Sequence, residues 1–271
     1  MLITSETYSL NAYRSLLRLA LAEGYRFCSF LDEPDGEGRR IYLRHDVDYS
    51  LGVASQLARV NQEEGVQGTF CVLLRSQIYN LLSYSELARA ESLLALGQRL
   101  ALHAVVPEPA PEGDAALAQF VLGEFALASR LLPGMDGAFS WHNPTPEVFE
   151  RGLSFEAPGL VNMYSARFVK DISYYSDTNL RHSVAEFRGI LRRGTPALQL
   201  LIHPINWVAE ESTMLGVLAR TWKSIIRERE EDVRTNRIYA AHFADGMPDA
   251  ILDALAGALA AGSLREQQQA G

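Results

Sequence analysis

The sequence predicts an α/β fold in which parallel strands form one curled sheet, as in an incomplete barrel. Short apolar runs of strand length alternate with longer segments whose apolar residues recur at helical spacing. This alternation repeats along most of the chain, which is typical of a parallel sheet covered by helices. The chain has 271 residues, of which 48% are hydrophobic and 21% are charged, so it can bury one full core. We therefore expect a single domain over residues 1–271.

Each predicted element follows from one of these two patterns. Strands are predicted from the short apolar runs at residues 40–46, 67–74, 99–104, 138–142, 171–176, 198–203 and 238–243. Helices are predicted from helical spacing at residues 12–22, 50–64, 85–96, 115–132, 183–192 and 211–232. Since most strands are followed by a helix, neighbouring strands can run parallel.

The residues at the helix ends support these boundaries. A serine that can cap the first turn precedes three of the helices, at Ser50, Ser85 and Ser183. A glycine suited to a left-handed C-cap follows three of them, at Gly65, Gly97 and Gly194. Ser83 is an equally good start for the third helix, because Glu86 lies where a capping box requires it. Residues 106–113 contain three prolines and are expected to form a loop, with an interdomain linker as the alternative, and the tail 263–271 is expected to fray.

The net charge and the cysteine content make some classes of function less favoured for this protein. A formal net charge of −8 disfavours nucleic-acid binding, which needs clustered basic residues. Cys28 and Cys71 lie inside apolar runs, which indicates reduced thiols. Residues 1–11 lack the features of a signal peptide, and no apolar run is long enough for a membrane span. We therefore expect a cytoplasmic protein, and a homo-oligomer is compatible with the sequence.

Acidic and imidazole side chains follow several of the predicted strands. The first strand ends in Asp46 and Asp48, which by strand alternation project the same way. Three further strands end in His103, His142 and His203. The carboxyl ends of parallel strands face the ligand crevice, so these five side chains are expected to converge.

Such a cluster has a definite chemistry. One carboxylate and two neutral imidazoles suit a divalent ion, with Zn²⁺ as the first candidate, and leave positions open for water and substrate. A second carboxylate can take a proton from that water, and a further histidine can protonate a leaving amine. The cluster therefore predicts hydrolysis of an amide or an ester.

Several segments resemble the polysaccharide deacetylase (NodB-like) family, in its RHDVD-type branch. They are residues 44–50, Gly65-Val66 with Thr69-Phe70, Leu74-Arg75-Ser76 with Tyr79-Asn80, Leu160-Val161-Asn162 with Tyr164-Ser165, and Leu201-Ile202-His203-Pro204. The resemblance implies a distorted (β/α)7 barrel with Asp46 as the catalytic base, Asp48 and His103 on the metal, and His203 as the catalytic acid. It covers roughly residues 25–207.

The chain departs from the family pattern at two points. The second motif of the family is commonly HxxxH, but the position four after His103 is Pro107, which has no ligating side chain. We expect His142 to replace the missing ligand, with Glu108 as the less favoured substitute. The arginine that usually orients the base is also missing after His142, and Arg44 or Arg75 is expected to serve, although a salt bridge at the strand end would explain Arg44 equally well.

The remaining candidates are substrate contacts. Residues that follow strand ends and are expected to bind substrate are Arg44, Arg75, Tyr79, Asn80 and Trp207. Asp177 is a weaker candidate for a substrate contact. His242 is expected in the core, with the edge of the pocket as the alternative, and His45 is expected to be structural.

The leading hypothesis is a cytoplasmic, metal-dependent N-deacylase of an acylated amino sugar, including a nucleotide-linked sugar used in envelope polysaccharide synthesis. Two alternatives are a non-catalytic carbohydrate- or protein-binding relative of the same fold, favoured by Pro107, and a hydrolase of a small non-sugar amide.

Overall fold

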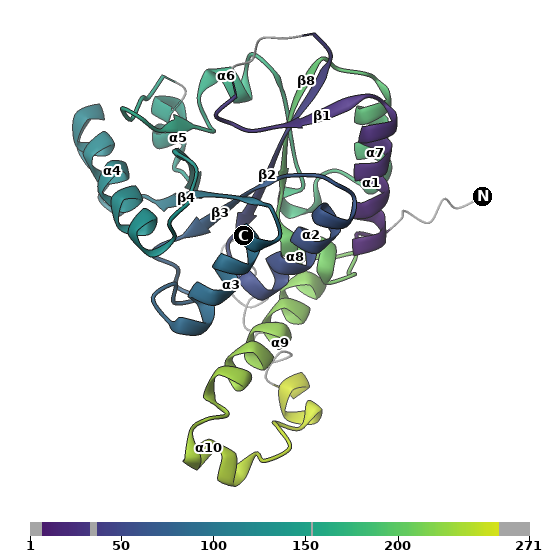
Figure 1. Ribbon diagram of the computed structural model, residues 1–271, viewed down its shortest axis with the longest axis vertical. Coiled ribbons are helices and arrows are strands. Elements are labelled where there is room, and N and C mark those ends of the chain that lie inside the picture. Colours follow the sequence, from purple (N-terminus) through teal and green to yellow (C-terminus); the bar gives the residue numbers. More distant parts are fainter. Residues whose placement is uncertain (1–6, 33–36, 153, 255–271) are drawn as a thin grey trace, which may run out of the picture.

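The computed structural model describes residues 7–32, 37–152 and 154–254. The frayed tail predicted at residues 263–271 lies outside this part of the chain. Within it, parallel strands form one sheet that is covered by helices (Figure 1). The predicted α/β fold with a parallel, barrel-like sheet is confirmed.

The sheet is built around its longest strand, β2. Its strands are β1 (Tyr25–Cys28), β2 (Arg39–Val47), β3 (Thr69–Leu73), β4 (Arg99–Val105), β5 (Ala138–His142), β6 (Val161–Asn162), β7 (Ser173–Ser176) and β8 (Ala197–Ile202). The order is β6-β5-β4-β3-β2-β8-β7, and every pairing is parallel. β1 pairs with the first residues of β2, and β3 pairs with the last ones. No pairing among the described residues joins β6 to β7, so the barrel stays open there.

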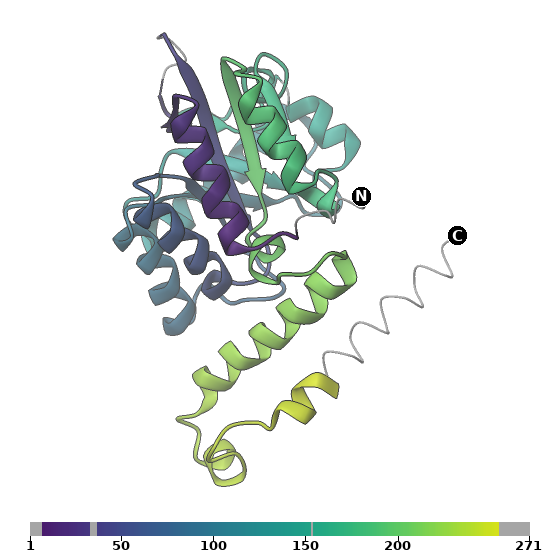
Figure 2. The ribbon, with the colours of Figure 1, turned by 90° about the vertical axis from the view of Figure 1, so that its right-hand side faces the viewer.

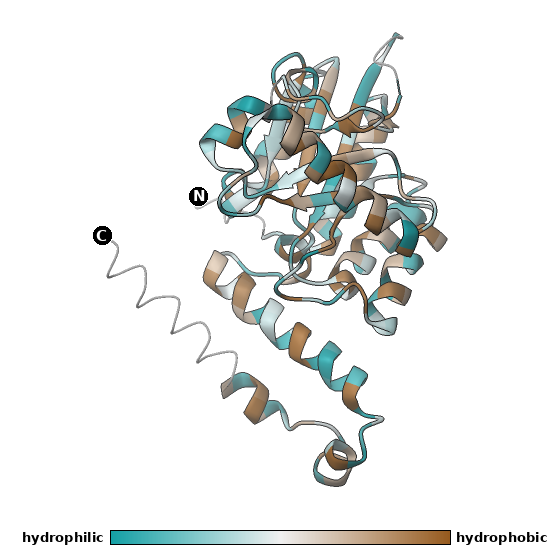
Figure 3. Ribbon diagram, turned by 90° about the vertical axis from the view of Figure 1, so that its left-hand side faces the viewer, coloured by the Kyte–Doolittle hydropathy of each residue, from teal (hydrophilic) through white to brown (hydrophobic). Residues whose placement is uncertain are grey.

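Most helices cover the sheet, and the last two extend away from it (Figures 1 and 2). They are α1 (Leu10–Ala22), α2 (Leu51–Glu63), α3 (Tyr84–Ala95), α4 (Gly113–Leu131), α5 (Pro146–Gly152), α6 (Ala166–Val169), α7 (Val184–Arg192), α8 (Pro204–Val208), α9 (Met214–Val233) and α10 (Arg237–His242). The long helix α9 runs along the body below α8 and carries α10 at its far end (Figures 1 and 2). Hydrophobic and hydrophilic residues alternate along α9, as expected for a helix that buries one face (Figure 3).

The helix ends largely follow the sequence. The hydroxyls of Ser50 and Ser183 accept hydrogen bonds from the first turns of α2 and α7, and Ser183 forms a full capping box with Glu186. The N-cap of α3 is Ser83, the alternative start. Gly65, Gly97 and Gly194 all have positive φ, as a left-handed C-cap requires.

The sequence prediction assigned one segment wrongly and missed two strands. Residues 238–243 do not form a strand, because Arg237–His242 is the helix α10, whose Asn236 cap accepts two backbone hydrogen bonds. β1 and β6 were not predicted, since both are short and only partly buried.

Among the described residues, no helix combines the length and the apolar character needed to cross a lipid bilayer.

Candidate functional site

Three side chains at the carboxyl ends of β2, β4 and β5 form a compact group of metal-ligand type. They are Asp48, which directly follows β2, His103 of β4 and His142, the last residue of β5. Asp48 Oδ1 lies 3.2 Å from His103 Nε2 and 3.2 Å from His142 Nδ1, and these two nitrogens are 3.2 Å apart. A tetrahedral site with bonds of about 2.0–2.1 Å places its ligand atoms about 3.3 Å apart. The group therefore fits Zn²⁺ or an ion of similar size.

The chemistry of the Asp48 carboxylate supports this fit. Burial alone would raise the pKa of Asp48, but the imidazoles of His103 and His142 keep it well below its usual range. Its Oδ1 is buried, and no hydrogen bond of normal geometry from the described residues reaches it. A buried carboxylate oxygen without a donor is costly, and a cation would remove that cost.

Neighbouring side chains orient the two imidazoles. The hydroxyl of Ser140 lies 2.6 Å from His103 Nδ1, on the strand that also carries His142. This contact turns His103 Nε2 toward Asp48, as partners behind metal-ligating histidines commonly do. On the exposed side, Asn143 Nδ2 lies 3.2 Å from His142 Nε2, which leaves His142 Nδ1 facing the group.

The second carboxylate, Asp46, is held by Arg44. Arg44 Nε and Nη2 donate to the two carboxylate oxygens over 2.7 and 2.6 Å, and the guanidinium is completely buried beside the ring of Tyr164. Burial alone would raise the pKa of Asp46, but the charge of Arg44 lowers it. Asp46 Oδ2 lies 3.6 Å from His103 Nε2, so an ionised carboxylate borders the ligand group.

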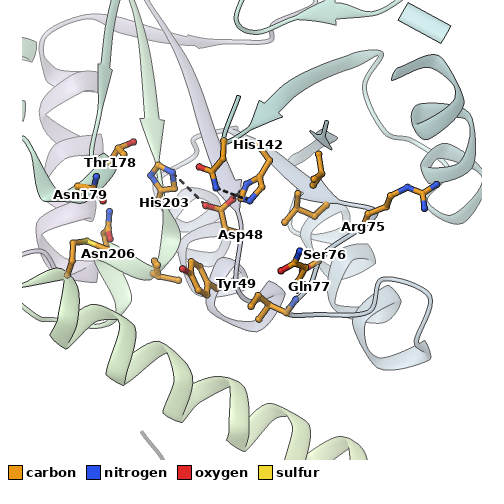
Figure 4. Close-up of a pocket in the computed structure, with 16 residues that line it drawn as sticks. Asp48, Tyr49, Arg75, Ser76, Gln77, His142, Thr178, Asn179, His203 and Asn206 are labelled. Carbon is orange, nitrogen blue, oxygen red and sulfur yellow. Dashed lines mark hydrogen bonds and ion pairs between the residues drawn. The ribbon is translucent and has the colours of Figure 1, made fainter. Parts of the chain in front are cut away.

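The third histidine, His203, lies on the other side of Asp48 and is held by Asp177. His203 Nδ1 lies 2.6 Å from Asp177 Oδ1, and Trp207 Nε1 donates to Asp177 Oδ2 over 2.8 Å. Burial alone would lower the pKa of His203, but the fully buried Asp177 carboxylate raises it to about 9. His203 Nε2 points toward Asp48 Oδ2 at 3.9 Å (Figure 4). The imidazole is therefore positively charged at neutral pH.

A cavity of about 470 Å³ opens over these groups. Asp48, His142 and His203 lie at its centre, between two polar walls (Figure 4). One wall is formed by Arg75, Ser76 and Gln77, and the other by Thr178, Asn179 and Asn206.

The structure brings together all five residues that were expected to converge: Asp46, Asp48, His103, His142 and His203. Glu108, the alternative ligand, is exposed in the proline-rich loop and is not part of the group found among the described residues. His45 is structural, since its ring is buried and stacks on Phe70.

Of the five expected substrate contacts, only Arg75 lines the cavity, where Glu124 pairs with its guanidinium. The other four residues do not line this cavity. Arg44 is completely buried against Asp46, and Trp207 is completely buried against Asp177. Tyr79 is buried between backbone groups, and the Asn80 side chain accepts a hydrogen bond from Leu82 N.

Two other expectations about the site are also corrected. Asp177 does not line the cavity wall, because its side chain is buried behind His203. His242 lies neither in the core nor at the edge of the pocket, because it is an exposed residue of α10. The sequence analysis missed Ser140 and the role of Asp177, which hold His103 and His203. Their positions gave a signal, because Asp177 directly follows a strand and Ser140 shares the face of β5 with His142.

No family model matches the sequence, and no curated protein matches it. Solved structures of similar fold include the following three. They are a chitin deacetylase from the fungal pathogen Colletotrichum lindemuthianum (14% identity, 68% of this chain and 81% of that chain, TM-score 0.42), a Bdellovibrio bacteriovorus peptidoglycan deacetylase (12%, 80% and 54%, TM-score 0.40) and a family 4 carbohydrate esterase from Bacillus anthracis (15%, 81% and 86%, TM-score 0.32). Because all three TM-scores are below 0.5, the similarity gives no basis for assigning an activity to the present chain. Its activity has to be inferred from its own residues.

Proposed function

We propose that the chain is a metal-dependent hydrolase that removes a small N-acyl group, acetyl or formyl, from an amino sugar, either free or nucleotide-linked. The observation that carries the proposal is the triangle of Asp48, His103 and His142 with sides of 3.2 Å, flanked by one ionised carboxylate and one protonated histidine. These are the groups that amide hydrolysis at neutral pH needs.

Asp48, His103 and His142 would hold the metal, with Zn²⁺ as the first candidate. When bound there, the ion would polarise the amide carbonyl and lower the pKa of water. Three protein ligands leave positions open on the side of the cavity, as in catalytic zinc sites. In this arrangement His142 takes the place of the ligand that Pro107 cannot provide.

Asp46 is the proposed base. Its carboxylate stays ionised because Arg44 lowers its pKa, and Arg44 also fixes its direction through two hydrogen bonds. A small cavity of about 10 Å³ lies between Asp46, Asp48 and His203. This is at about the lower limit for a cavity that can hold one water molecule, and Asp46 can accept a proton from a water held there.

His203 is the proposed acid. Burial lowers the pKa of His203, but the Asp177 carboxylate more than offsets this effect and raises the pKa to about 9. His203 Nε2 therefore carries a proton at neutral pH. This atom points toward the centre of the cavity, where it can protonate the amine nitrogen as the bond to the acyl carbon breaks (Figure 4). Asp46 and His203 thus have opposite protonation states, as an acid and a base require.

The cavity suits a small polyhydroxylated substrate. Its volume of about 470 Å³ is within the range of small-molecule sites, and amides and hydroxyls from both walls can pair with sugar hydroxyls.

The experiment combines metal content with product release. Purified protein is expected to hold about one zinc per chain and to release acetate or formate from a panel of N-acylated amino sugars and nucleotide-linked sugars. Asp48→Ala, His103→Ala and His142→Ala should each lose metal and activity, while Asp46→Asn should keep the metal and lose activity. Wild type without stoichiometric metal would contradict the proposal. Metal binding without turnover of any sugar would favour a carbohydrate-binding relative or a hydrolase of a non-sugar amide.

A further inference from the structure

The turn that carries Asp48 is fixed on one side by Tyr79. β2 ends at Val47 and α2 begins at Leu51, so Asp48 lies in a three-residue connection. The Tyr79 hydroxyl donates to the carbonyl of Val47 over 2.9 Å and accepts from Leu73 N over 2.8 Å. These two hydrogen bonds fix the backbone immediately before the metal ligand.

The other side of the turn is held from α9. Ser50, the last residue before α2, donates its hydroxyl to Glu228 Oε1 over 2.7 Å and accepts from Val53 N over 2.9 Å. The Ser50 hydroxyl therefore uses its only proton on Glu228 while it caps α2. The Glu228 side chain is 17% exposed, and its negative charge lies at the N-terminal end of α2, where the helix dipole favours it.

The absence of a side chain at Gly52 supports a specific fit between the two helices. A Cβ at this position would overlap Glu228 Oε1, so the carboxylate keeps its present place only while residue 52 has no side chain. Glycine near the start of a helix costs up to about 1 kcal/mol relative to alanine. The close approach of Glu228 to α2 gives a physical reason for a residue that helix propensity disfavours.

Further ion pairs hold the part of α9 that carries Glu228. Arg229 pairs with the fully buried Glu86 of α3, and Asp232 pairs with Arg89 over 3.1 Å. Glu228 also lies 3.7 Å from the guanidinium of Arg229. The carboxylate is thus presented to α2 by a helix that is itself anchored to α3.

We propose that Glu228 is a positioning residue for the metal-binding turn: through Ser50 it fixes the end of the turn that Tyr79 does not fix, and so sets the place of Asp48. The inference rests on the metal site of the proposed function and adds a residue of α9 to it. Its physical basis is that a metal ligand binds best when its backbone is already held in place.

The test measures zinc affinity of the full-length protein by competition with a chromophoric chelator. Glu228→Ala is expected to weaken zinc binding roughly fivefold, less than the loss of about 10- to 100-fold typical when a group bonded directly to a ligand is removed. Glu228→Gln should stay within twofold of wild type, because its carbonyl oxygen can still accept from Ser50. Glu231→Gln, an exposed position of the same helix, is the matched control and should have no effect.

Gly52→Ala provides an independent arm, because it leaves Glu228 intact but displaces its carboxylate. It should weaken zinc binding as much as Glu228→Ala does, and the double variant should be no weaker than Glu228→Ala alone. If Glu228→Ala does not fold, the zinc affinity of Gly52→Ala tests the positioning role of Glu228 by itself. Unchanged affinity in these variants, together with metal loss in Asp48→Ala, would overturn the inference and leave the proposed function standing. Absence of zinc binding by wild type would overturn both.

Discussion

Asp177 is the residue that sets the charge of His203. It accepts hydrogen bonds from the His203 backbone and from Trp207, and its Oδ1 lies 2.6 Å from the His203 imidazole. Asp177→Asn would remove the negative charge and would turn an amide donor toward one of these donors. We expect kcat to fall between about 10- and 100-fold, a part of the 10²- to 10⁴-fold that a general acid contributes. KM and metal content should hardly change.

Steady-state kinetics on the zinc-loaded protein measure the effects of Asp177→Asn on kcat and on KM separately. The control is Asn179→Ala, at an exposed position of the cavity wall, which should raise KM more than it lowers kcat. An Asp177→Asn protein with wild-type kcat would show that His203 is not the acid.

His45 makes stability depend on pH without belonging to the site. Burial lowers the pKa of His45 from 6.5 to about 3, so the folded protein holds it neutral while the unfolded chain protonates it below about pH 6.5. Because the unfolded state binds more protons between these values, the free energy of unfolding falls as the pH drops. The stabilisation is complete above pH 6.5, and about 2 kcal/mol of it should be lost between pH 7 and pH 5.

Urea unfolding of wild type and His45→Gln at both pH values isolates this contribution from that of other groups. The variant is expected to be less stable at pH 7, because it loses the stacking on Phe70, but to lose about 2 kcal/mol less than wild type between the two pH values. Equal losses in the two proteins would show that His45 is already protonated in the fold or titrates normally.

At the residue scale, the sequence allowed the positions of the central groups to be predicted, but not the directions of the surrounding side chains. Asp46, Asp48 and the three histidines end apolar strands, and parallel pairing brings such ends together. Tyr79 and Trp207 also follow strand ends, but each finds a buried partner, Val47 and Asp177, that only the folded chain places beside it. Such contacts depend on tertiary packing, so spacing alone could not predict them.

At the scale of elements, Gly68 allows the start of β3 to pack closely against His45 of β2 and Asn61 of α2. A Cβ at Gly68 would lie 2.6 Å from His45 Cε1 and 3.1 Å from Asn61 Nδ2, and both of these side chains are buried. Gly68→Ala is therefore expected to destabilise the protein by about 1–3 kcal/mol through overpacking.

Gly123 in α4 is the matched control, since a Cβ there would meet nothing within 4 Å. Gly123→Ala should stabilise the protein by about 0.5–1 kcal/mol, the ordinary effect of removing a helix glycine. Denaturant unfolding measures both changes. A neutral Gly68→Ala would show that His45 and Asn61 can move aside.

The elements themselves were predicted from local patterns wherever those patterns were long. α2, α3, α7 and α9 carry caps or helical spacing over several turns, and their predicted and observed ends differ by no more than a few residues. Residues 238–243 were assigned wrongly, because an apolar run of this length fits a strand and a short helix equally well. β6 has two residues, too few for any periodicity to appear.

At the scale of the whole molecule, the site exists only when the sheet is complete. Its residues run from Arg44 to His203, and β2 joins the strands of the ligand group on one side to β8 and β7 on the other. The unfolded chain cannot hold these groups together, because each pairing closes a long loop. Metal binding should therefore be linked to folding.

Zinc is accordingly expected to raise the stability of wild type by about 2.7 kcal/mol when the free ion is at one hundred times its dissociation constant. Thermal unfolding with zinc, and after dialysis against a chelator, measures this as a reversible shift of Tm that grows with the logarithm of free zinc. Asp48→Ala should abolish the shift, since it removes one of the three ligands of the triangle. Asp46→Asn should preserve it, because Asp46 lies beside the triangle and is held by Arg44. An equal loss of the shift in both variants would mean that Asp46 itself binds the ion, and the base would then have to be sought elsewhere in the cavity.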